Sequence, residues 1–309
     1  MIDLAQEWRV LDRTRRRPDS ADHWDKRAKT YTFKDAPGSY VESFIKKMNL
    51  DGAERILDMG CGTGSIAIPL ASRGHEVIAA DFSKGMLERV ESNAQTAHVL
   101  HPDYLAESVD LSLVVPRMGD ESRKEGVFPL YMSWEDDWNS FGLGAKSVDV
   151  CVASRSIITH DLEESIQKLS NTARKSVCVT AATKHSPRID ERVARAMGLN
   201  LKKHNDALYV FGIAMDLGYE PEVSYIRSRK LKSFATRDEA FQSYLSILEY
   251  VDDSAEQVSI DEAQERLNAW LDEHLVCKSD ATSPTKGESL VWTLDEPRIV
   301  SWAFISWRV

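Results

Sequence analysis

Three closely spaced glycines follow a short apolar run and precede a helical pattern, in the segment Ile56-Leu57-Asp58-Met59-Gly60-Cys61-Gly62-Thr63-Gly64. Glycines at such a turn let the backbone approach a ligand closely, and the N-terminus of the following helix faces that ligand. A dinucleotide site would place its third glycine where Ser65 stands. The carboxylate of Asp58 would also repel a pyrophosphate. The segment therefore favours a nucleoside that carries a cationic amino-acid group.

A second acidic residue supports the prediction of a nucleoside ligand. Asp81 stands 17 residues after Gly64, where a second apolar run ends. A carboxylate at the end of the second strand of such a unit accepts hydrogen bonds from ribose hydroxyls. We expect Asp81 to bind the ribose and Phe82 to lie against the adenine.

The elements that must position these residues alternate between short β-rich runs and helical patterns, which is typical of a parallel sheet covered by helices. Ser83 and Asp161 are candidate N-caps of two of the helices, and a further helix is expected near residues 204–217. The expected strands are Arg55–Met59, Glu76–Ala80, Phe128–Met132, Val148–Ala153, Ser176–Thr180, Pro221–Arg229 and Arg298–Val309.

With these elements the sequence resembles the class I S-adenosylmethionine-dependent methyltransferases, in particular the small-molecule branch that includes the quinone-biosynthesis C-methyltransferases. The resemblance rests on Asp58-x-Gly60-x-Gly62-x-Gly64, on Ala79–Ser83 with Met86 after it, and on Val148–Ser154. It covers residues 20–232 and the last strand. It implies an α/β fold with a Rossmann-like, seven-stranded, mostly parallel sheet whose last strand is antiparallel. It also implies S-adenosylmethionine as the cofactor and a methyl acceptor as the second substrate.

The resemblance also implies a set of cofactor-binding residues. Asp58 and the glycine turn would hold the methionine part, Asp81 the ribose, and Phe82 with Met86 the adenine. The segment His23–Tyr31 is similar to one that folds over the cofactor. The full set is Asp58, Gly60, Cys61, Gly62, Gly64, Asp81, Phe82, Ser83, Met86, Trp134, Glu135, Asp136, Ser154 and Tyr31.

The loop after the third strand often supplies an acid to the adenine amino group in such enzymes, and two placements of that strand are open. In the first, Phe128–Met132 is the strand, Asp136 or its neighbour Glu135 is the acid, and Trp134 lies beside the base. In the second, Leu111–Pro116 is the strand and Asp120 is the acid.

The acceptor side has fewer signals. His160 follows the fourth strand, and an imidazole is suited to act as a general base, although alignment does much of the work in methyl transfer and a base is optional. Lys184 and His185 follow the fifth strand and are further candidates. His98 and His101 lack a third ligand at a sensible spacing, so no metal site is expected.

The residues after the fourth strand and the net charge indicate what kind of molecule accepts the methyl group. Ser154-Arg155-Ser156-Ile157 occupies the place of the Asn/Asp-Pro-Pro-Tyr/Phe stretch of enzymes that methylate adenine or glutamine nitrogen. The chain has 39 Lys and Arg against 49 Asp and Glu, a net charge of −10, and an acidic chain has no general footprint for a phosphate backbone. A small-molecule acceptor is therefore expected, and no nucleic-acid partner.

Two alternatives stay open at this stage. A tRNA or protein methyltransferase would use a basic face built from Arg13–Arg17 with Arg123 and Lys124. A non-catalytic S-adenosylmethionine-binding regulatory protein would lack a cavity beside the methyl group. The sequence indicates nothing about the oligomeric state.

The chain divides into a cover segment at 1–39, a methyltransferase domain at 40–235 and 298–309, and a helical insertion at 236–297. The insertion has four Lys or Arg against fifteen Asp or Glu, and it shows two capping boxes that begin at Thr236 and Ser259. We expect it to form a lid over the acceptor. Residues 98–126 are too long and polar for an ordinary connection and are expected to be an insertion or a mobile loop.

Composition limits the cellular setting. Of the 309 residues, 42% are hydrophobic and 28% are charged, and no apolar run approaches the length of a membrane span. The four cysteines lie far apart without a Cys-x-x-Cys pair, and the N-terminus shows no apolar signal segment. A cytoplasmic protein with no membrane contact is expected.

Overall fold

The fold was obtained as a computed structural model. It describes residues 3–13, 20–30, 38–102, 104, 125–184, 189–200, 205–250, 258–279 and 290–309. The chain forms two compact units. The first comprises Met1–Ala181, Asp206–Ile226 and Ala303–Val309, and the second comprises Ala182–Asn205 and Arg227–Trp302.

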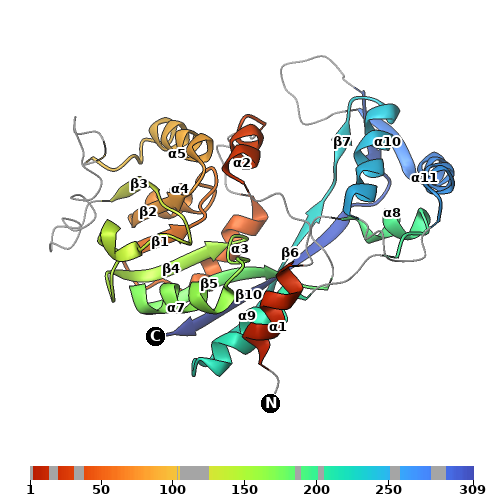
Figure 1. The fold of residues 1–309 in the computed structure, drawn as a ribbon. Coiled ribbons are helices and arrows are strands. Elements are labelled where there is room, and N and C mark those ends of the chain that lie inside the picture. Colours follow the sequence, from red (N-terminus) through yellow and green to blue (C-terminus); the bar gives the residue numbers. More distant parts are fainter. Residues whose placement is uncertain are drawn as a thin grey trace. The chain divides into compact units, whose positions relative to one another are not determined.

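A seven-stranded sheet, ordered β3-β2-β1-β4-β5-β10-β6, organises the first unit (Figure 1). It is mostly parallel with one antiparallel strand, and β10, the last strand of the chain, lies between β5 and β6. This is the Rossmann-like architecture that the resemblance implied. The strands are β1 Arg55–Met59, β2 Glu76–Asp81, β3 Gly126–Tyr131, β4 Val148–Ser154, β5 Ala173–Ala182, β6 Glu222–Lys230 and β10 Arg298–Arg308.

Every expected strand of this sheet is present. Most of them carry an apolar run, whereas β6 is polar and largely exposed. All residues of β1 and β2 are buried, as expected of parallel strands covered on both faces. The register places Met59 beside Ala80 and Asp58 beside both Ala79 and Val152. The carboxyl ends of β1, β2 and β4 therefore meet at one edge of the sheet.

The third strand lies where the first of the two placements predicted it. β3 pairs in parallel with β2, from Gly126 beside Glu76 to Tyr131 beside Asp81. Residues 111–116 and Asp120, which carry the rival placement, lie outside the described residues, as does most of the expected insertion at 98–126.

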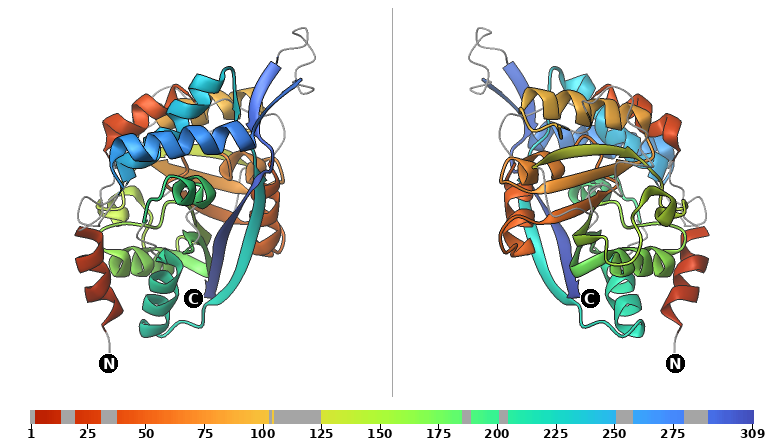
Figure 2. Two further views of the ribbon diagram at one scale, coloured as in Figure 1. Left: turned by 90° about the vertical axis from the view of Figure 1, so that its right-hand side faces the viewer. Right: turned by 90° about the vertical axis from the view of Figure 1, so that its left-hand side faces the viewer.

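Helices cover both faces of the first unit's sheet. α1, α7 and α9 pack against one another, and their apolar side chains Trp8, Ile166 and Ile213 join the core of the sheet (Figure 2). Ser83 and Asp161 cap α5 and α7 as predicted. The helices are α1 Leu4–Arg13, α2 Ala21–Ala28, α3 Ser39–Met48, α4 Ala67–Ala71, α5 Lys84–Thr96, the 3-10 turn η1 Trp138–Phe141, α7 Leu162–Thr172 and α9 Asp206–Asp216.

The second unit has its own apolar core, to which Val193, Leu267 and Leu294 contribute from different elements. Its two longest helices begin after Thr236 and Ser259, as the capping boxes predicted. The second unit also contains a three-stranded sheet, ordered β7-β9-β8, which the sequence pattern did not predict. The elements are α8 Glu191–Ala196, β7 Ser233–Phe234, α10 Arg237–Leu245, η2 Ser246–Tyr250, α11 Ile260–His274, β8 Leu275–Ser279 and β9 Leu290–Leu294.

Among the described residues, no helix combines the length and the apolar character that crossing a membrane requires.

Candidate functional site

The glycine turn lies directly after β1 and is held against the end of β2. The backbone N–H groups of Gly60 and Cys61 both donate to the carbonyl of Ala80, at 2.8 and 3.0 Å. Gly60, Gly62 and Gly64 have φ values of 71°, 57° and 81°, a region that side chains with a Cβ rarely adopt. The three glycines are therefore required by the backbone itself.

The surroundings of the glycines differ. A Cβ on Gly60 would collide with the side chain of Ser156, whose hydroxyl donates to the carbonyl of Met59 at 2.6 Å. A Cβ on Gly62 would have no atom within 4 Å. Gly60 thus serves the contact between β1 and the chain after β4, whereas Gly62 leaves open space beside the turn.

This difference makes Gly60→Ala and Gly62→Ala a matched pair. In the cofactor-free protein we expect Gly62→Ala to cost about 1–2 kcal/mol of stability, from φ strain alone. Gly60→Ala should cost more, because its methyl group must also displace Ser156. Thermal unfolding measures both, and calorimetry should show that Gly62→Ala loses cofactor affinity although it folds. Equal stability losses in the two variants would contradict this interpretation.

Asp58 is the most unusual carboxylate at this edge. It is 1% exposed, and among the described residues neither of its oxygens has a hydrogen bond of ordinary geometry, although the backbone amide of Ala67 lies near enough to interact weakly. Burial, and then the negative charge of Asp81, raise its pKa to about 7, while the backbone amide of Ala67 opposes the shift. A buried acid without a partner is costly, so it calls for a cationic group to accept. Asp58 therefore fits the ammonium group of an amino-acid ligand.

Asp81 ends β2 and joins the glycine turn to the next helix. Its Oδ2 accepts from the N–H of Gly62 at 2.9 Å, and its Oδ1 accepts from the N–H of Ser83 at 2.9 Å. Each carboxylate oxygen has two lone pairs, so both can accept a further donor such as a ribose hydroxyl. Phe82 is half-buried and Met86 is buried beside this turn.

Cys61 lies in the glycine turn, is buried and is close enough to both acids to feel their charges. Burial, together with the charges of Asp81 and Asp58, holds the pKa of its thiol well above the ordinary value. The thiol is therefore not a nucleophile, since only the thiolate reacts. Its place in the turn is compatible with a role through its backbone.

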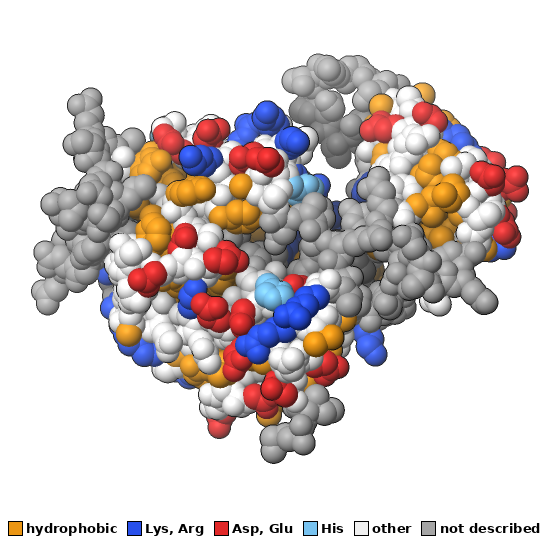
Figure 3. All heavy atoms as spheres, viewed as in Figure 1, with side chains coloured by type: hydrophobic (Ala, Val, Ile, Leu, Met, Phe, Trp, Pro, Cys, Tyr) orange, Lys and Arg blue, Asp and Glu red, His pale blue; other side chains and the backbone are white. Residues whose placement is uncertain are grey.

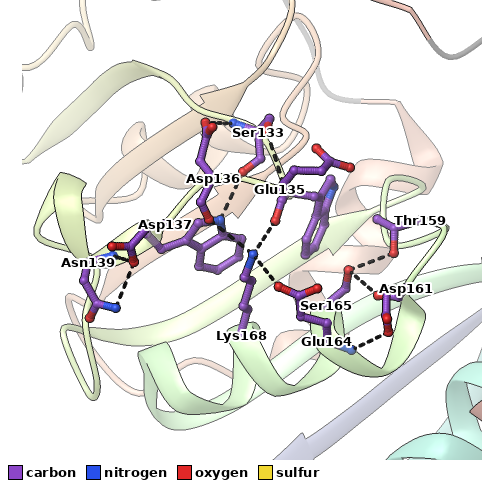
Figure 4. Close-up of polar contacts among 12 residues, drawn as sticks. Ser133, Glu135, Asp136, Asp137, Asn139, Thr159, Asp161, Glu164, Ser165 and Lys168 are labelled. Carbon is purple, nitrogen blue, oxygen red and sulfur yellow. Dashed lines mark hydrogen bonds and ion pairs between the residues drawn. The ribbon is translucent and has the colours of Figure 1, made fainter.

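The loop after β3 is folded on itself by internal hydrogen bonds (Figure 4). The carboxylate of Asp136 accepts from the N–H of Ser133 at 2.7 Å, and the hydroxyl of Ser133 accepts from the N–H of Glu135 at 3.1 Å. Lys168 of α7 donates to the carbonyls of Trp134 and Asp136, at 2.7 and 3.2 Å. In Figure 4 the carboxylate of Glu135 extends away from this network. Asp136 thus shapes the loop, and Glu135 is the exposed acid.

We expect Asp136→Ala to weaken cofactor binding by releasing the turn at Ser133, whereas Asp120→Ala should leave binding unchanged. Glu135→Gln separates a direct contact from a shaping role, because it keeps the side-chain length and every hydrogen bond of the loop. Calorimetry with S-adenosylhomocysteine, the demethylated cofactor, measures all three. Weaker binding in Asp120→Ala but not in Asp136→Ala would show that the adenine-side loop is misassigned.

The chain after β4 presents a group of polar side chains at the same edge. The hydroxyl of Tyr40, from α3, lies 2.9 Å from that of Ser154 and 2.8 Å from that of Thr180. Arg155 has a φ of 66°, and its guanidinium stands 3.5 Å from the centre of the Tyr40 ring. Non-glycine residues in this conformation cluster at functional sites, where the surrounding structure holds them.

His160 lies farther along this chain, next to α1. Its side chain is 57% exposed, and its Nδ1 is 3.2 Å from a carboxylate oxygen of Asp12. The same loop is held by Trp8, whose indole N–H donates to the carbonyl of Thr159, and by Arg9, which pairs with Asp161. The structure thus places His160 at the surface with an acidic partner, and its role as a base stays a prediction.

Several residues that the sequence singled out are not found at this edge of the sheet in the described part of the chain. Tyr31 and His185 lie outside the described residues. His101 is buried at the amino end of the sheet, with its Nε2 3.6 Å from Glu76. Within the described ranges, no cluster of three or more His, Cys, Asp or Glu could hold a metal ion.

Sequence patterns missed the residues that support the site from other elements. Lys168 belongs to an ordinary amphipathic helix, and Tyr40 lies more than 100 residues from both of its hydroxyl partners. Asp25 accepts from Ser83 across 58 residues. The one available signal was the segment around Trp24 and Asp25, which was expected to lie over the cofactor.

The part of the chain that contains the glycine turn after β1 is similar to a known protein family. Residues 56–116 match the family described as a methyltransferase domain. The chain is 27% identical over 271 residues to an uncharacterized protein of Haemophilus influenzae, covering 87% of each. It is 33% identical over 70 residues to the 23S rRNA (uracil(1939)-C(5))-methyltransferase of Legionella pneumophila, covering 23% of this chain and 16% of the relative.

Among solved structures, the magnesium protoporphyrin IX methyltransferase of Synechocystis, with bound S-adenosylmethionine, is 17% identical. The match covers 74% of this chain and 91% of that one, with a TM-score of 0.40.

Proposed function

We propose that this chain, a class I S-adenosylmethionine-dependent methyltransferase, methylates a small-molecule acceptor. When bound, the cofactor supplies an electrophilic methyl group on a sulfonium. The observation that carries the choice of acceptor is the polar group formed by Ser154, Arg155 and Tyr40 at the carboxyl edge of the sheet. Polar side chains that hold one another in place suit an acceptor that is recognised group by group.

The cofactor would be held by residues that already share this edge. Asp58 would accept from the α-amino group, which would give its two unpartnered oxygens their donors. Asp81 would accept from the ribose hydroxyls, and the open space beside Gly62 admits the approach of a ligand to the turn. The loop after β3 would border the adenine, with Lys168 fixing its carbonyls.

Charge supports a small acceptor over a nucleic acid. The chain carries a net charge of −10, and acidic and basic side chains are interspersed over the first unit on the face drawn in Figure 3. Binding a phosphate backbone takes clustered Lys and Arg. The similarity to the rRNA methyltransferase covers only 16% of that protein, so its acceptor is the second candidate here and not the first.

One experiment separates the two candidates. The purified protein is incubated with a methyl-labelled donor and, in separate reactions, with a small-molecule extract of cells and with their total RNA. We expect label in compounds of low mass, identified by mass spectrometry, and none in RNA. Asp58→Asn serves as the control for enzyme-dependent transfer. Label in RNA alone would overturn the choice of acceptor while leaving the cofactor assignment intact.

We further propose that His160 removes a proton from the acceptor, with Asp12 orienting its ring through Nδ1. General-base catalysis contributes about 10²–10⁴-fold to a rate, so His160→Gln should lower kcat by that range at unchanged cofactor affinity. Asp12→Asn should lower kcat less, because it removes only the orienting partner. An unchanged kcat in His160→Gln would remove the histidine from the mechanism.

We propose that the segment 236–297 is a lid that sets acceptor specificity. It interrupts the chain between β6 and β10, the last two strands of the seven-stranded sheet, and its composition is acidic. Removal of this segment would uncover Val193 of α8 and Met197 directly after it, which are both buried in the second unit. A test variant therefore replaces 231–297 by a Gly/Ser linker and both of these residues by Ser. We expect cofactor affinity within a few-fold and loss of turnover. Full activity of a folded variant would contradict the proposal.

A further inference from the structure

The N-terminal helix α2 is attached to the helix that follows Asp81. Asp25 of α2 accepts through Oδ1 from the hydroxyl of Ser83 at 2.6 Å and from the N–H of Gly85 at 2.9 Å. At the C-terminal end of α2, Arg89 donates to the carbonyl of Ala28 at 3.2 Å. α2 therefore lies along α5 and is fixed at its middle and at its C-terminal end (Figure 1).

Ser83 is the residue through which this contact reaches the candidate cofactor site. Its N–H donates to Oδ1 of Asp81, and its hydroxyl accepts from the N–H of Met86 at 3.1 Å while donating to Asp25. The hydrogen bonds from Ser83 and then Gly85 lower the pKa of Asp25, so its carboxylate is ionised at the N-terminus of α5. One serine thus joins the carboxylate of α2 to the acid at the end of β2.

Gly85 gives an independent sign that close approach matters here. A Cβ at this position would lie 3.1 Å from both Cα and Oδ1 of Asp25, closer than ordinary van der Waals contact. Gly85 lies in the first turn of α5 without a positive φ, where alanine would favour the helix. The glycine is therefore explained by the neighbouring helix and not by the backbone of α5.

From these contacts we infer that Asp25 is a positioning residue for Asp81, and that docking of α2 on Ser83 and Gly85 is coupled to cofactor binding. A displaced Ser83 would turn the carboxylate of Asp81 away from the orientation in which it meets the ribose. Coupling is reciprocal, so bound cofactor must in turn hold α2 in place. The inference concerns only the cofactor half of the site and is independent of the acceptor.

The test compares Asp25→Asn with Asp22→Asn, which removes an exposed carboxylate from the same helix. Calorimetry with S-adenosylhomocysteine should show at least ten-fold weaker binding for Asp25→Asn and a change within two-fold for Asp22→Asn. Trypsin cleavage after the exposed Lys26 provides the second measurement. Cofactor should slow this cleavage in the wild-type protein and in Asp22→Asn, and much less in Asp25→Asn.

Two further variants separate positioning from a structural role. Gly85→Ala should weaken cofactor binding while leaving α5 intact, because it displaces Asp25 by a few tenths of an ångström without removing any polar group. In the double variant Asp25→Asn with Ser83→Ala, the loss in affinity should be smaller than the sum of the two single losses, since the two residues share one hydrogen bond. The inference is overturned if Asp25→Asn lowers the melting temperature but binds S-adenosylhomocysteine like the wild type. It is equally overturned if cofactor protects Lys26 in all variants alike.

Discussion

Cofactor affinity is expected to fall about ten-fold for each pH unit below 7, because Asp58 must be ionised to accept the cofactor's ammonium group. Burial raises the pKa of this carboxyl to about 7 in the free protein. At pH 5 the carboxyl is protonated in most molecules, so calorimetry should show binding about 100-fold weaker than at neutral pH. The measurement stays at pH 7.5 and below, since an α-amino group itself titrates near pH 8.

Asp58→Asn is the control for this dependence. The amide cannot ionise, so affinity should no longer vary between pH 5 and 7. At pH 7.5 it should be weaker by about 100-fold or more, as expected when a buried ion pair worth about 3 kcal/mol loses its anion. A wild-type protein whose affinity is constant from pH 5 to 7.5 would show that Asp58 does not meet the ammonium group.

The same variant should have the opposite effect on stability. The pKa of Asp58 is about 7 in the folded protein, against 3.8 for an unperturbed aspartate, so its ionisation lowers the free energy of unfolding. This cost is absent below pH 4, grows between pH 4 and 7, and amounts to about 4 kcal/mol above pH 7. Asp58→Asn should therefore raise the melting temperature of the cofactor-free protein at pH 7.5 but not at pH 4. A lower melting temperature at pH 7.5 would contradict the burial of an unpartnered charge.

Asp81→Ala is expected to weaken both S-adenosylmethionine and S-adenosylhomocysteine by about 30- to 1000-fold. This corresponds to about 2–4 kcal/mol, the value of two charge-assisted hydrogen bonds less the compensation by water. The alanine also leaves the N–H groups of Gly62 and Ser83 without their acceptor, so the melting temperature should fall. Calorimetry and thermal unfolding measure the two effects.

Asp81→Asn separates these effects, because its one remaining oxygen can hold one of the two backbone donors while the charge is lost. Glu88→Gln, an exposed change on α5, is the matched control and should bind like the wild type. NADH should not compete in any variant. Equal affinity of Asp81→Asn and the wild type for both ligands would remove Asp81 from the ribose site.

The prediction of the sheet from the sequence succeeded where local pattern and tertiary environment agree. β1 and β4 are mostly apolar, β1 is buried along its whole length and β4 along all but its last residue, as expected of parallel strands that lie between two layers of helices. The caps Ser83 and Asp161 were predictable because the side chain and the N–H groups it satisfies lie within three residues. The small sheet of the second unit was missed, because β8 follows α11 directly without a turn signal between them.

What the sequence determined by itself is the set of groups whose partners are close along the chain or are imposed by the backbone. The turn from Asp58 to Gly64, the acid Asp81 at the end of the next strand and the alternation of strands and helices are of this kind, since spacing alone brings them to one edge of a parallel sheet. Tertiary structure alone decided which distant side chains hold that edge. The contacts of Asp25 with Ser83, of Tyr40 with Ser154 and of Lys168 with the loop after β3 join residues 32 to 114 positions apart. It also decided that Asp58 is buried without a partner, because the charge state of a carboxyl depends on the solvent and charges around it, which no local pattern of residues specifies.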